Sequence, residues 1–278
     1  MNRRDLGWLI GIICGDGYIG YGRVALDTTS PRIAKRMIDI WKEVTNSKIK
    51  LEVYGEHTNF RNILSEDFLH YRKKSENCSP TVKIRIDSVD ISKKISNLKN
   101  NFLYDISNRQ QEEKIGFLQG IFDSEGTVSP DCTVQIDMSK QNFSLLRICS
   151  KLLEELQIKH TLKEFKSKIR LKVIGGTKNV SNIEKFSSIV GFSSEKQEEL
   201  EEIIRIYKRP RESRNKFQVR RLLLKLLRER KEVELKNLMS LLSVKYDFIK
   251  KLINELSGEN IIEKVRKGKR VFIRYKTH

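Results

Sequence analysis

The sequence contains the same short segment twice, about one small domain apart. Leu6–Ile19 aligns with Ile115–Val128 at an offset of 109 residues, and glycines and large apolar side chains match along both copies. Each copy precedes the same order of patterns: two short alternating runs, an amphipathic segment, two more alternating runs and a second helical segment. The repeat therefore predicts an α+β fold of two αββαββα halves related by a pseudo-two-fold axis.

The expected elements follow from the apolar periodicity of each half. The first half should form its elements at residues 18–29, 31–45, 49–54, 81–87 and 89–104. The second half should form them at residues 127–137, 141–156, 161–165, 168–174 and 179–189. We place the halves at residues 1–106 and 107–207, and a separate C-terminal domain at residues 208–278.

Small residues recur every four positions in both copies of the repeat, so they line one face of each predicted helix. A glycine inside a helix costs about 0.5–1 kcal/mol relative to alanine, so three in register indicate a packing role. Small side chains at this spacing let two helix backbones approach closely. We expect the two helices to meet through Gly7, Gly11, Gly15, Gly116, Gly120 and Ser124.

Each glycine-faced segment ends in an acid followed by glycine, at Asp16-Gly17 and Glu125-Gly126. If the helices pair about the pseudo-two-fold axis, both acids arrive at the same end. Two carboxylates at helix C-termini face mutual repulsion and the negative end of each helix dipole. A divalent cation held by carboxylate, carbonyl and water oxygens would balance them.

These two segments resemble the signature motifs of LAGLIDADG homing endonucleases, in the form that carries both motifs on one chain. The resemblance extends over about residues 1–207. It implies a monomer with internal symmetry that cuts both strands of DNA at a long pseudo-palindromic site. It also implies that Asp16 and Glu125 bind Mg²⁺, or another divalent cation, and position water for phosphodiester hydrolysis.

The family also carries a polar or basic residue near the end of the second strand of each half. Lys140 matches that position in the second half and is expected to be catalytic. Thr28 and Thr29 stand at the equivalent place in the first half, which departs from the family pattern. The sixth motif position is Asp123 in the second copy, and helix phase turns it away from the paired acids.

The alternating strands place Lys and Arg opposite their apolar residues, and each sheet is therefore expected to offer a mostly cationic outer face. Two such faces would form a saddle for the major groove of double-stranded DNA. The expected contacts are Lys48, Lys50, Lys83, Arg85, Lys168, Arg170 and Lys172.

Charge is concentrated after residue 207. The chain has 55 Lys plus Arg and 36 Asp plus Glu, which gives a net charge of +19. Residues 208–278 hold 22 of the Lys and Arg residues but only 8 of the Asp and Glu residues. Three helical segments (216–229, 234–242, 244–256) and two strands (261–265, 270–275) resemble a winged helix, with Ser243 as N-cap of the third helix. Its DNA contacts would be Lys245, Tyr246, Lys250, Lys251, Lys267, Lys269 and Arg270.

Other features narrow the class of protein. The four cysteines form no CxxC pair, which argues against structural zinc and disulfides. No stretch approaches the roughly 20 apolar residues of a membrane span, so we expect a cytoplasmic protein. Two alternatives stay open: a DNA-binding transcriptional regulator that keeps the fold without cleavage, and an RNA splicing helper.

Overall fold

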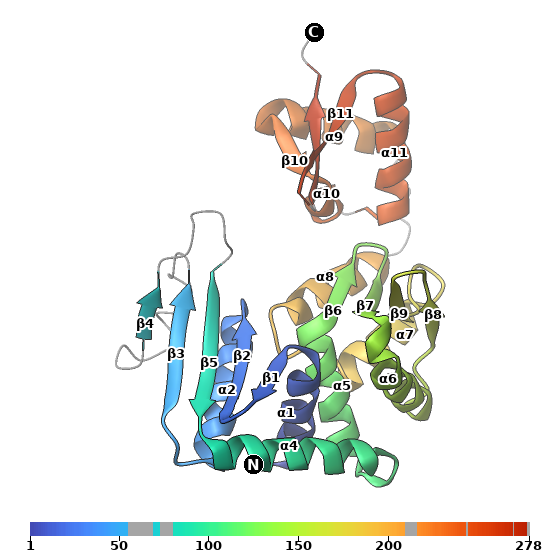
Figure 1. The fold of residues 1–278 in the computed structure, drawn as a ribbon. Helices are drawn as coiled ribbons and strands as arrows, with labels where there is room; N and C mark the ends of the chain where they lie inside the picture. Colours follow the sequence, from blue (N-terminus) through green and yellow to red (C-terminus); the bar gives the residue numbers. More distant parts are fainter. Residues whose placement is uncertain (55–68, 73–79, 209–215, 243, 269, 277–278) are drawn as a thin grey trace. The chain divides into compact units, whose positions relative to one another are not determined.

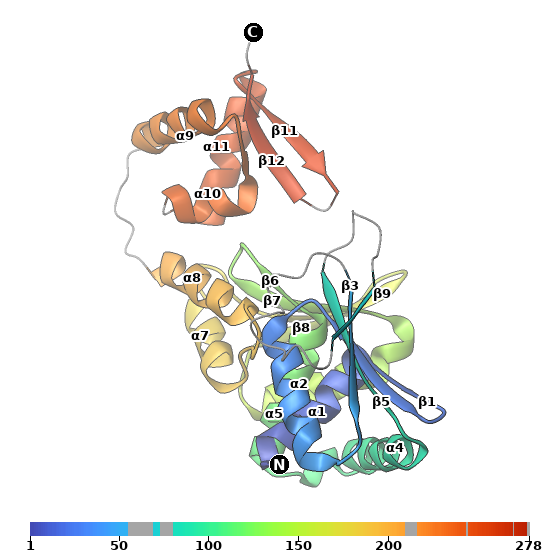
Figure 2. The ribbon, with the colours of Figure 1, turned by 90° about the vertical axis from the view of Figure 1, so that its left-hand side faces the viewer.

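A computed structural model describes residues 1–54, 69–72, 80–208, 216–242, 244–268 and 270–276 (Figures 1 and 2). It is a mixed helix-and-sheet structure, and the expected α+β fold class is confirmed. The chain forms two compact units. The first comprises residues 1–127, 135–172 and 185–197, and the second comprises 128–134, 173–184 and 198–278. The three-domain division at residues 106 and 207 stays a prediction.

The first half builds one sheet, in the strand order β1-β2-β5-β3-β4. Its elements are α1 (Arg3–Gly15), β1 (Gly17–Gly20), β2 (Arg23–Thr28), α2 (Pro31–Val44), β3 (Ile49–Tyr54), β4 (Leu69–Arg72), β5 (Thr81–Asp87) and α4 (Val89–Tyr104). Neighbouring strands are antiparallel except β3 and β4, which are parallel. The sequence pattern did not indicate β4, which adds to the otherwise unpaired edge of β3.

The second half builds a sheet in the order β6-β7-β9-β8. Its elements are η2 (Ile106–Asn108), α5 (Gln111–Glu125), β6 (Gly126–Ser129), β7 (Thr133–Ser139), η3 (Lys140–Asn142), α6 (Phe143–Glu155), β8 (His160–Glu164), β9 (Lys168–Val173), α7 (Val180–Ile189) and α8 (Lys196–Lys208). The helix expected at 141–156 begins as the 3₁₀ turn η3. The order αββαββα expected from the sequence did not include α8, a helix that contributes a residue to the site described below.

The C-terminal segment forms three helices and a three-stranded antiparallel sheet in the order β10-β12-β11. Its elements are α9 (Lys216–Arg230), β10 (Glu232–Glu234), α10 (Leu235–Leu242), α11 (Tyr246–Gly258), β11 (Ile262–Lys267) and β12 (Arg270–Tyr275). The third helix begins two residues later than expected, with Lys245 at its N-cap. The expected N-cap Ser243 lies outside the described residues. The order of elements suits a winged helix, an assignment that stays a prediction.

No helix among the described residues combines the length and apolar character needed to cross a bilayer.

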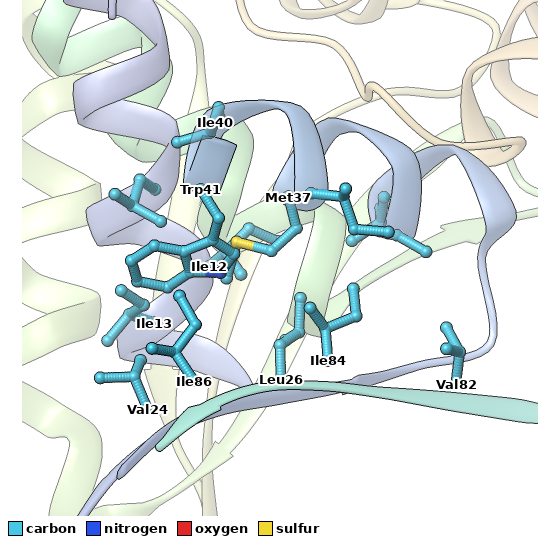
Figure 3. Close-up of a cluster of buried hydrophobic side chains, with 14 of the residues drawn as sticks. Ile12, Ile13, Val24, Leu26, Met37, Ile40, Trp41, Val82, Ile84 and Ile86 are labelled. Carbon is cyan, nitrogen blue, oxygen red and sulfur yellow. The ribbon is translucent and has the colours of Figure 1, made fainter. Parts of the chain in front are cut away.

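The core of the first half lies between α2 and the sheet, with α1 beside it (Figure 3). The Ser30 hydroxyl caps α2 by accepting from the Ile33 amide at 3.3 Å, and Pro31 suits the first turn. Met37 and Trp41 then fall on the face of α2 toward the sheet. The inward residues of β2 and β5 complete the cluster: Val24, Leu26, Val82, Ile84 and Ile86.

The two repeated helices, α1 and α5, lie side by side with their backbones in contact (Figure 1). A Cβ atom added at Gly11 would lie 2.2 Å from the Phe117 carbonyl oxygen, and one at Gly120 would lie 2.3 Å from the Trp8 carbonyl oxygen. Gly7 and Gly116 face the opposite backbone equally closely. These distances are below van der Waals contact, so a larger residue requires the helices to move apart.

We therefore expect Gly120→Ala to destabilise the protein by about 1–3 kcal/mol, the usual cost of overpacking. The measurement is the melting temperature of the purified variant. Gly258→Ala, in α11, is the matched control because a Cβ there meets nothing within 4 Å. The control should leave stability unchanged or raise it slightly. Equal melting temperatures for Gly120→Ala and wild type would show that the helices do not pack this closely.

Candidate active site

The two acids of the repeat lie at the adjoining C-terminal ends of α1 and α5. Asp16 caps α1, and its amide donates to the Ile12 carbonyl at 3.0 Å. Glu125 is the last residue of α5. The ends are close, because a Cβ on Gly15 would lie 2.0 Å from Ser124 Oγ and 3.4 Å from Glu125 Cγ. The close helix pairing thus brings the acids together at one end.

The surroundings of both acids disfavour the ionised carboxylates. Burial raises the pKa of Asp16, and nearby Asp27 raises it further. Burial likewise raises the pKa of Glu125, and the charge of Asp16 adds to that effect. Lys196 opposes both shifts. This is the electrostatic pattern of a site that gains from a bound cation.

Lys196 is a site residue that the sequence patterns did not reveal. It is the first residue of α8, and its Nζ donates to the carbonyl oxygen of Asp123 at 2.8 Å. That carbonyl belongs to the last turn of α5, two residues before Glu125. The ammonium also lies 5.8 Å from the centre of the Phe192 ring. No motif surrounds Lys196, and only the fold brings it to the acids.

Asp123 lies at the sixth motif position, and its side chain is 2% exposed. Its carboxylate accepts from Trp8 Nε1 at 2.8 Å, from the Ser193 amide at 2.9 Å and from the Ser193 hydroxyl at 2.5 Å. The side chain therefore ties α1 and α5 to the segment that precedes α8. This agrees with the helix phase, which turns it away from the acids.

Lys140 lies in η3, where its Nζ pairs with Glu164 at 2.6 Å. Lys196 opposes the raised pKa values of Asp16 and Glu125, whereas Lys140 has an acid of its own in Glu164. The catalytic role of Lys140 stays a prediction.

A hollow of about 370 Å³ opens beside Asp16 on the outer face of the first sheet. Tyr18 on β1 lines it and is 59% exposed. Arg23 and Asp27 on β2 and Lys83 on β5 complete the polar lining. The hollow therefore places cations and an exposed aromatic ring next to one of the two acids.

The cations of the first sheet are paired with acids on neighbouring strands. Because Arg23 stands opposite Asp87 in the β2–β5 register, the two form an ion pair at 2.8 Å. Lys50 reaches the same Asp87 at 2.8 Å. Lys83 pairs with Asp27 at 3.4 Å, directly across the strands.

Arg85 completes this pattern, because it pairs with Glu52 on β3 at 2.7 Å. Glu52 is 5% exposed and also accepts from Tyr54 at 2.7 Å. The expectation of a mostly cationic face is therefore wrong for this sheet. β2 and β3 each carry an acid of their own, Asp27 and Glu52, and Asp87 ends β5, so acids and cations share this face.

In the second sheet, as in the first, cations pair with a carboxylate on a neighbouring strand, and here one acid binds two of them. Lys168 and Arg170 of β9 both bind Asp137 of β7, at 2.8 and 2.6 Å. Lys172 follows on the same face of β9, and Lys48 is exposed just before β3. Five of the seven expected contacts thus have side chains that pair with carboxylates: Lys50, Lys83, Arg85, Lys168 and Arg170.

The predicted contacts of the C-terminal segment cluster at α11 and at the β11–β12 turn. Lys245 is the N-cap of α11 and Tyr246 is its first residue. Lys250 Nζ lies 6.0 Å from the centre of the Tyr246 ring, with Lys251 next to it. Lys267 ends β11, lies 5.0 Å from the Phe272 ring and pairs with Glu232, whereas Arg270 begins β12. Lys269 lies outside the described residues.

The residues at the helix ends fit a hard cation that keeps water ligands. Their donors are two carboxylates and the last backbone carbonyls of two helices, all of them oxygen. The described residues contain no cluster of three or more His, Cys, Asp or Glu side chains that could hold a metal ion. Mg²⁺ commonly uses one or two carboxylates, with water and phosphate oxygens completing its shell.

A protein-family model matches the part of the chain that contains the second copy of the repeat. Residues 112–191 match the model of the LAGLIDADG-like domain. The resemblance expected from the motifs is thereby confirmed for the second half, and the match includes α5 with Glu125. No match was found among curated proteins.

Two solved structures are among those similar to this chain. The homing endonuclease I-DmoI in complex with DNA and Ca is 19% identical, with 72% of this chain and 97% of that chain covered and a TM-score of 0.48. Full-length DUF199/WhiA from Thermatoga maritima is 15% identical, with 95% of this chain and 94% of that chain covered and a TM-score of 0.47.

The raised pKa values of Asp16 and Glu125 predict how the stability of the metal-free protein depends on pH. An acid whose folded pKa lies above its unfolded value, about 4, destabilises the fold as it ionises. Wild type in EDTA should therefore lose stability as the pH rises from about 4 through the raised values. Asp16→Asn should melt above wild type at pH 8, and the difference should shrink as the pH falls toward the unfolded pKa of about 4.

Asp137→Asn is the matched control with the opposite sign. Hydrogen bonds from Arg170 and Lys168 hold the pKa of Asp137 below its usual value, so its charge stabilises the fold above the unfolded pKa. This variant should melt below wild type at pH 8. A loss of stability in Asp16→Asn that does not change with pH would contradict the site electrostatics.

Proposed function

We propose that this protein is a site-specific endonuclease for double-stranded DNA that depends on Mg²⁺ or another divalent cation. One observation supports this above all: the carboxylates of Asp16 and Glu125 are held at the adjoining ends of two glycine-faced helices, in a chain with a LAGLIDADG-like domain. Paired carboxylates in such a position suit metal-assisted cleavage of a phosphodiester.

Different residues of the site would bind the cation, position the acids and contact the phosphate. Asp16 and Glu125 would hold the cation with nearby backbone carbonyls. When bound, such a cation would lower the pKa of water and stabilise charge on the phosphate oxygens. The pairing of α1 with α5 fixes the acids, and the hollow beside Asp16 offers Arg23 and Lys83 to a phosphate. Lys140 is the remaining proposed catalytic group.

The two sheets would provide the specific DNA contacts, at a long pseudo-palindromic site that follows the pseudo-two-fold axis of a monomer. Lys168 and Arg170 can contact phosphates or bases, and carboxylates such as Asp137 can accept from the cytosine amino group. Residues 208–278 would form a winged-helix domain whose positive charge adds affinity.

The test is DNA cleavage by the purified protein, with a plasmid that carries the DNA flanking its own gene. Wild type should linearise this plasmid in Mg²⁺ and bind it without cleavage in Ca²⁺. Asp16→Asn and Glu125→Gln should each lose cleavage by about 10³-fold or more while binding in Ca²⁺ survives, because only a charged ligand is removed.

Arg147→Gln, on α6, serves as the control substitution because it changes an exposed charge, over the Phe143 ring, that is not among the proposed site residues. It should cleave like wild type. Unimpaired cleavage by Glu125→Gln would overturn the metal-ligand assignment. Sequence-specific binding without cleavage by wild type would instead support the alternative of a transcriptional regulator, and preferred binding to RNA would support a splicing helper.

The charge of the C-terminal segment makes a separate prediction about salt dependence. The double variant Lys250→Gln/Lys251→Gln removes two cations from α11. If both contact phosphates, the slope of log K against log salt should flatten by about 1.8, because each neutralised phosphate contributes roughly 0.9. The site of cleavage should not change.

Lys93→Gln/Lys94→Gln on α4 is the matched control, because α4 carries two adjacent lysines and none of the proposed DNA contacts. Fluorescence anisotropy at several salt concentrations measures both slopes. If the α11 variant keeps the full slope, these lysines do not contact DNA.

A further inference from the structure

Helix α9 carries cations on two sides, and acids of a neighbouring element lie beside one of them. Lys216 pairs with Glu255 of α11 at 2.7 Å. Arg220 donates to Glu259, the residue that follows α11, at 2.9 Å. Both cations adjoin the apolar side of α9, whose buried residues are Val219, Leu223 and Leu227. These ion pairs therefore join α9 to α11.

Three other cations occupy the opposite side of α9. At about 100° per residue, Arg221, Lys225 and Arg228 fall within about 60° of one another and roughly opposite the buried residues. All three are exposed. We call these three residues the α9 stripe. The stripe faces away from α11, because Lys216 and Arg220 take the side that faces it.

The α9 stripe lacks the acids that balance cations elsewhere in the protein. Within the described part of the chain, no ion pair joins the stripe to an acid on another element. Lys225 is 73% exposed and pairs with Glu229 of its own helix at 3.9 Å. Arg228 donates to the Tyr275 hydroxyl at 3.1 Å and lies 5.0 Å from the centre of that ring. The sheet cations of the first unit have partners across strands, whereas this stripe keeps its positive charge.

We propose that the α9 stripe binds the phosphate backbone of a second DNA duplex while α11 and the sheets hold the first. This inference rests on the proposed DNA-binding function and adds to it a second, sequence-independent site. The stripe contacts no bases in this proposal.

The spacing of the stripe suits a nucleic-acid backbone. From Arg221 to Arg228 the helix rises about 10 Å, at about 1.5 Å per residue. Each strand of B-DNA carries one phosphate in about every 3.4 Å of its axis, so the stripe has the length of about three phosphates. A guanidinium can donate twice to one phosphate. Arg228 is already oriented by Tyr275 and keeps further N–H groups for this contact.

A duplex on the α11 side leaves the stripe free for another. Figure 2 shows α9 and β11 at opposite sides of the C-terminal segment. A straight duplex that follows α11 and β11 therefore does not reach the outer side of α9. With both sides occupied, the protein would hold two DNA segments at once and could pass between them before release.

The test measures a complex of one protein with two duplexes. Wild type is first saturated in Ca²⁺ with an unlabelled duplex from the DNA that flanks its own gene. A short dye-labelled duplex of unrelated sequence is then titrated, and its anisotropy is followed at several salt concentrations. Wild type should bind this second duplex. In Arg221→Gln/Lys225→Gln the slope of log K against log salt for the second duplex should flatten by about 1.8, because two phosphate contacts are lost.

Lys93→Gln/Lys94→Gln, on α4, is the matched control because it removes the same charge from a helix without proposed DNA contacts. It should bind the second duplex like wild type. The affinity of Arg221→Gln/Lys225→Gln for the first duplex should equal that of wild type, and so should its melting temperature, since both side chains are exposed.

Three results would overturn the proposal. The saturated wild type could fail to bind the second duplex, or Arg221→Gln/Lys225→Gln could bind it with the full salt slope. The variant could instead lose affinity for the first duplex, which would assign the stripe to that DNA. If poly-glutamate binds through the stripe and the second duplex does not, the occupant is an acidic protein surface.

The outcome separates this inference from the nuclease function. Cleavage by wild type without binding of a second duplex would overturn this inference alone. Binding of two duplexes without cleavage in Mg²⁺ would overturn the nuclease function and leave the second site supported.

Discussion

The backbone contact between α1 and α5 is the constraint on which the rest of the structure depends. Where Gly11 meets Phe117 and Gly120 meets Trp8, the helices are closer than any side chain would permit. The helices therefore cannot slide or separate without loss of this contact. The same contact fixes the distance between the ends that carry Asp16 and Glu125. Packing in the interior of the first unit thus determines how the two carboxylates lie relative to each other.

The polar groups along this pair of helices extend the same constraint outward. Arg36 of α2 stacks 4.4 Å from the centre of the Trp8 ring and binds both Asp5 and Gln119. Asp123 receives the Trp8 indole from one side and Ser193 from the other. Buried polar groups of this kind are costly unless they are satisfied, so they specify one arrangement of the elements. The segment at residues 190–196, which includes Lys196, is positioned by that arrangement.

Local patterns predicted most of the fold. The bounds of β3, β5, α4 and β12 agree with the sequence, because strict alternation or a clear N-cap marks each of them. The acids and the interface glycines were found because the chain repeats them. Lys196 could not be found in this way, since its place depends on contacts of Asp123 with residues about 70 positions away. The strand cations were misjudged for a similar reason: the alternation shows which face a side chain takes but not which acid stands across from it.

The ion pairs on the sheet faces change what binding to a polyanion would involve. A lysine that already holds a carboxylate has an internal counterion, so moving to a phosphate exchanges one anion for another and releases fewer ions from solution. Salt dependence would then fall short of the number of cations on the sheets. Each exchange would also leave Asp87 or Asp137 without its partner, facing the negative backbone of the nucleic acid. Only a duplex that offers those carboxylates a donor would offset that repulsion, so the paired acids would disfavour binding at random sequences.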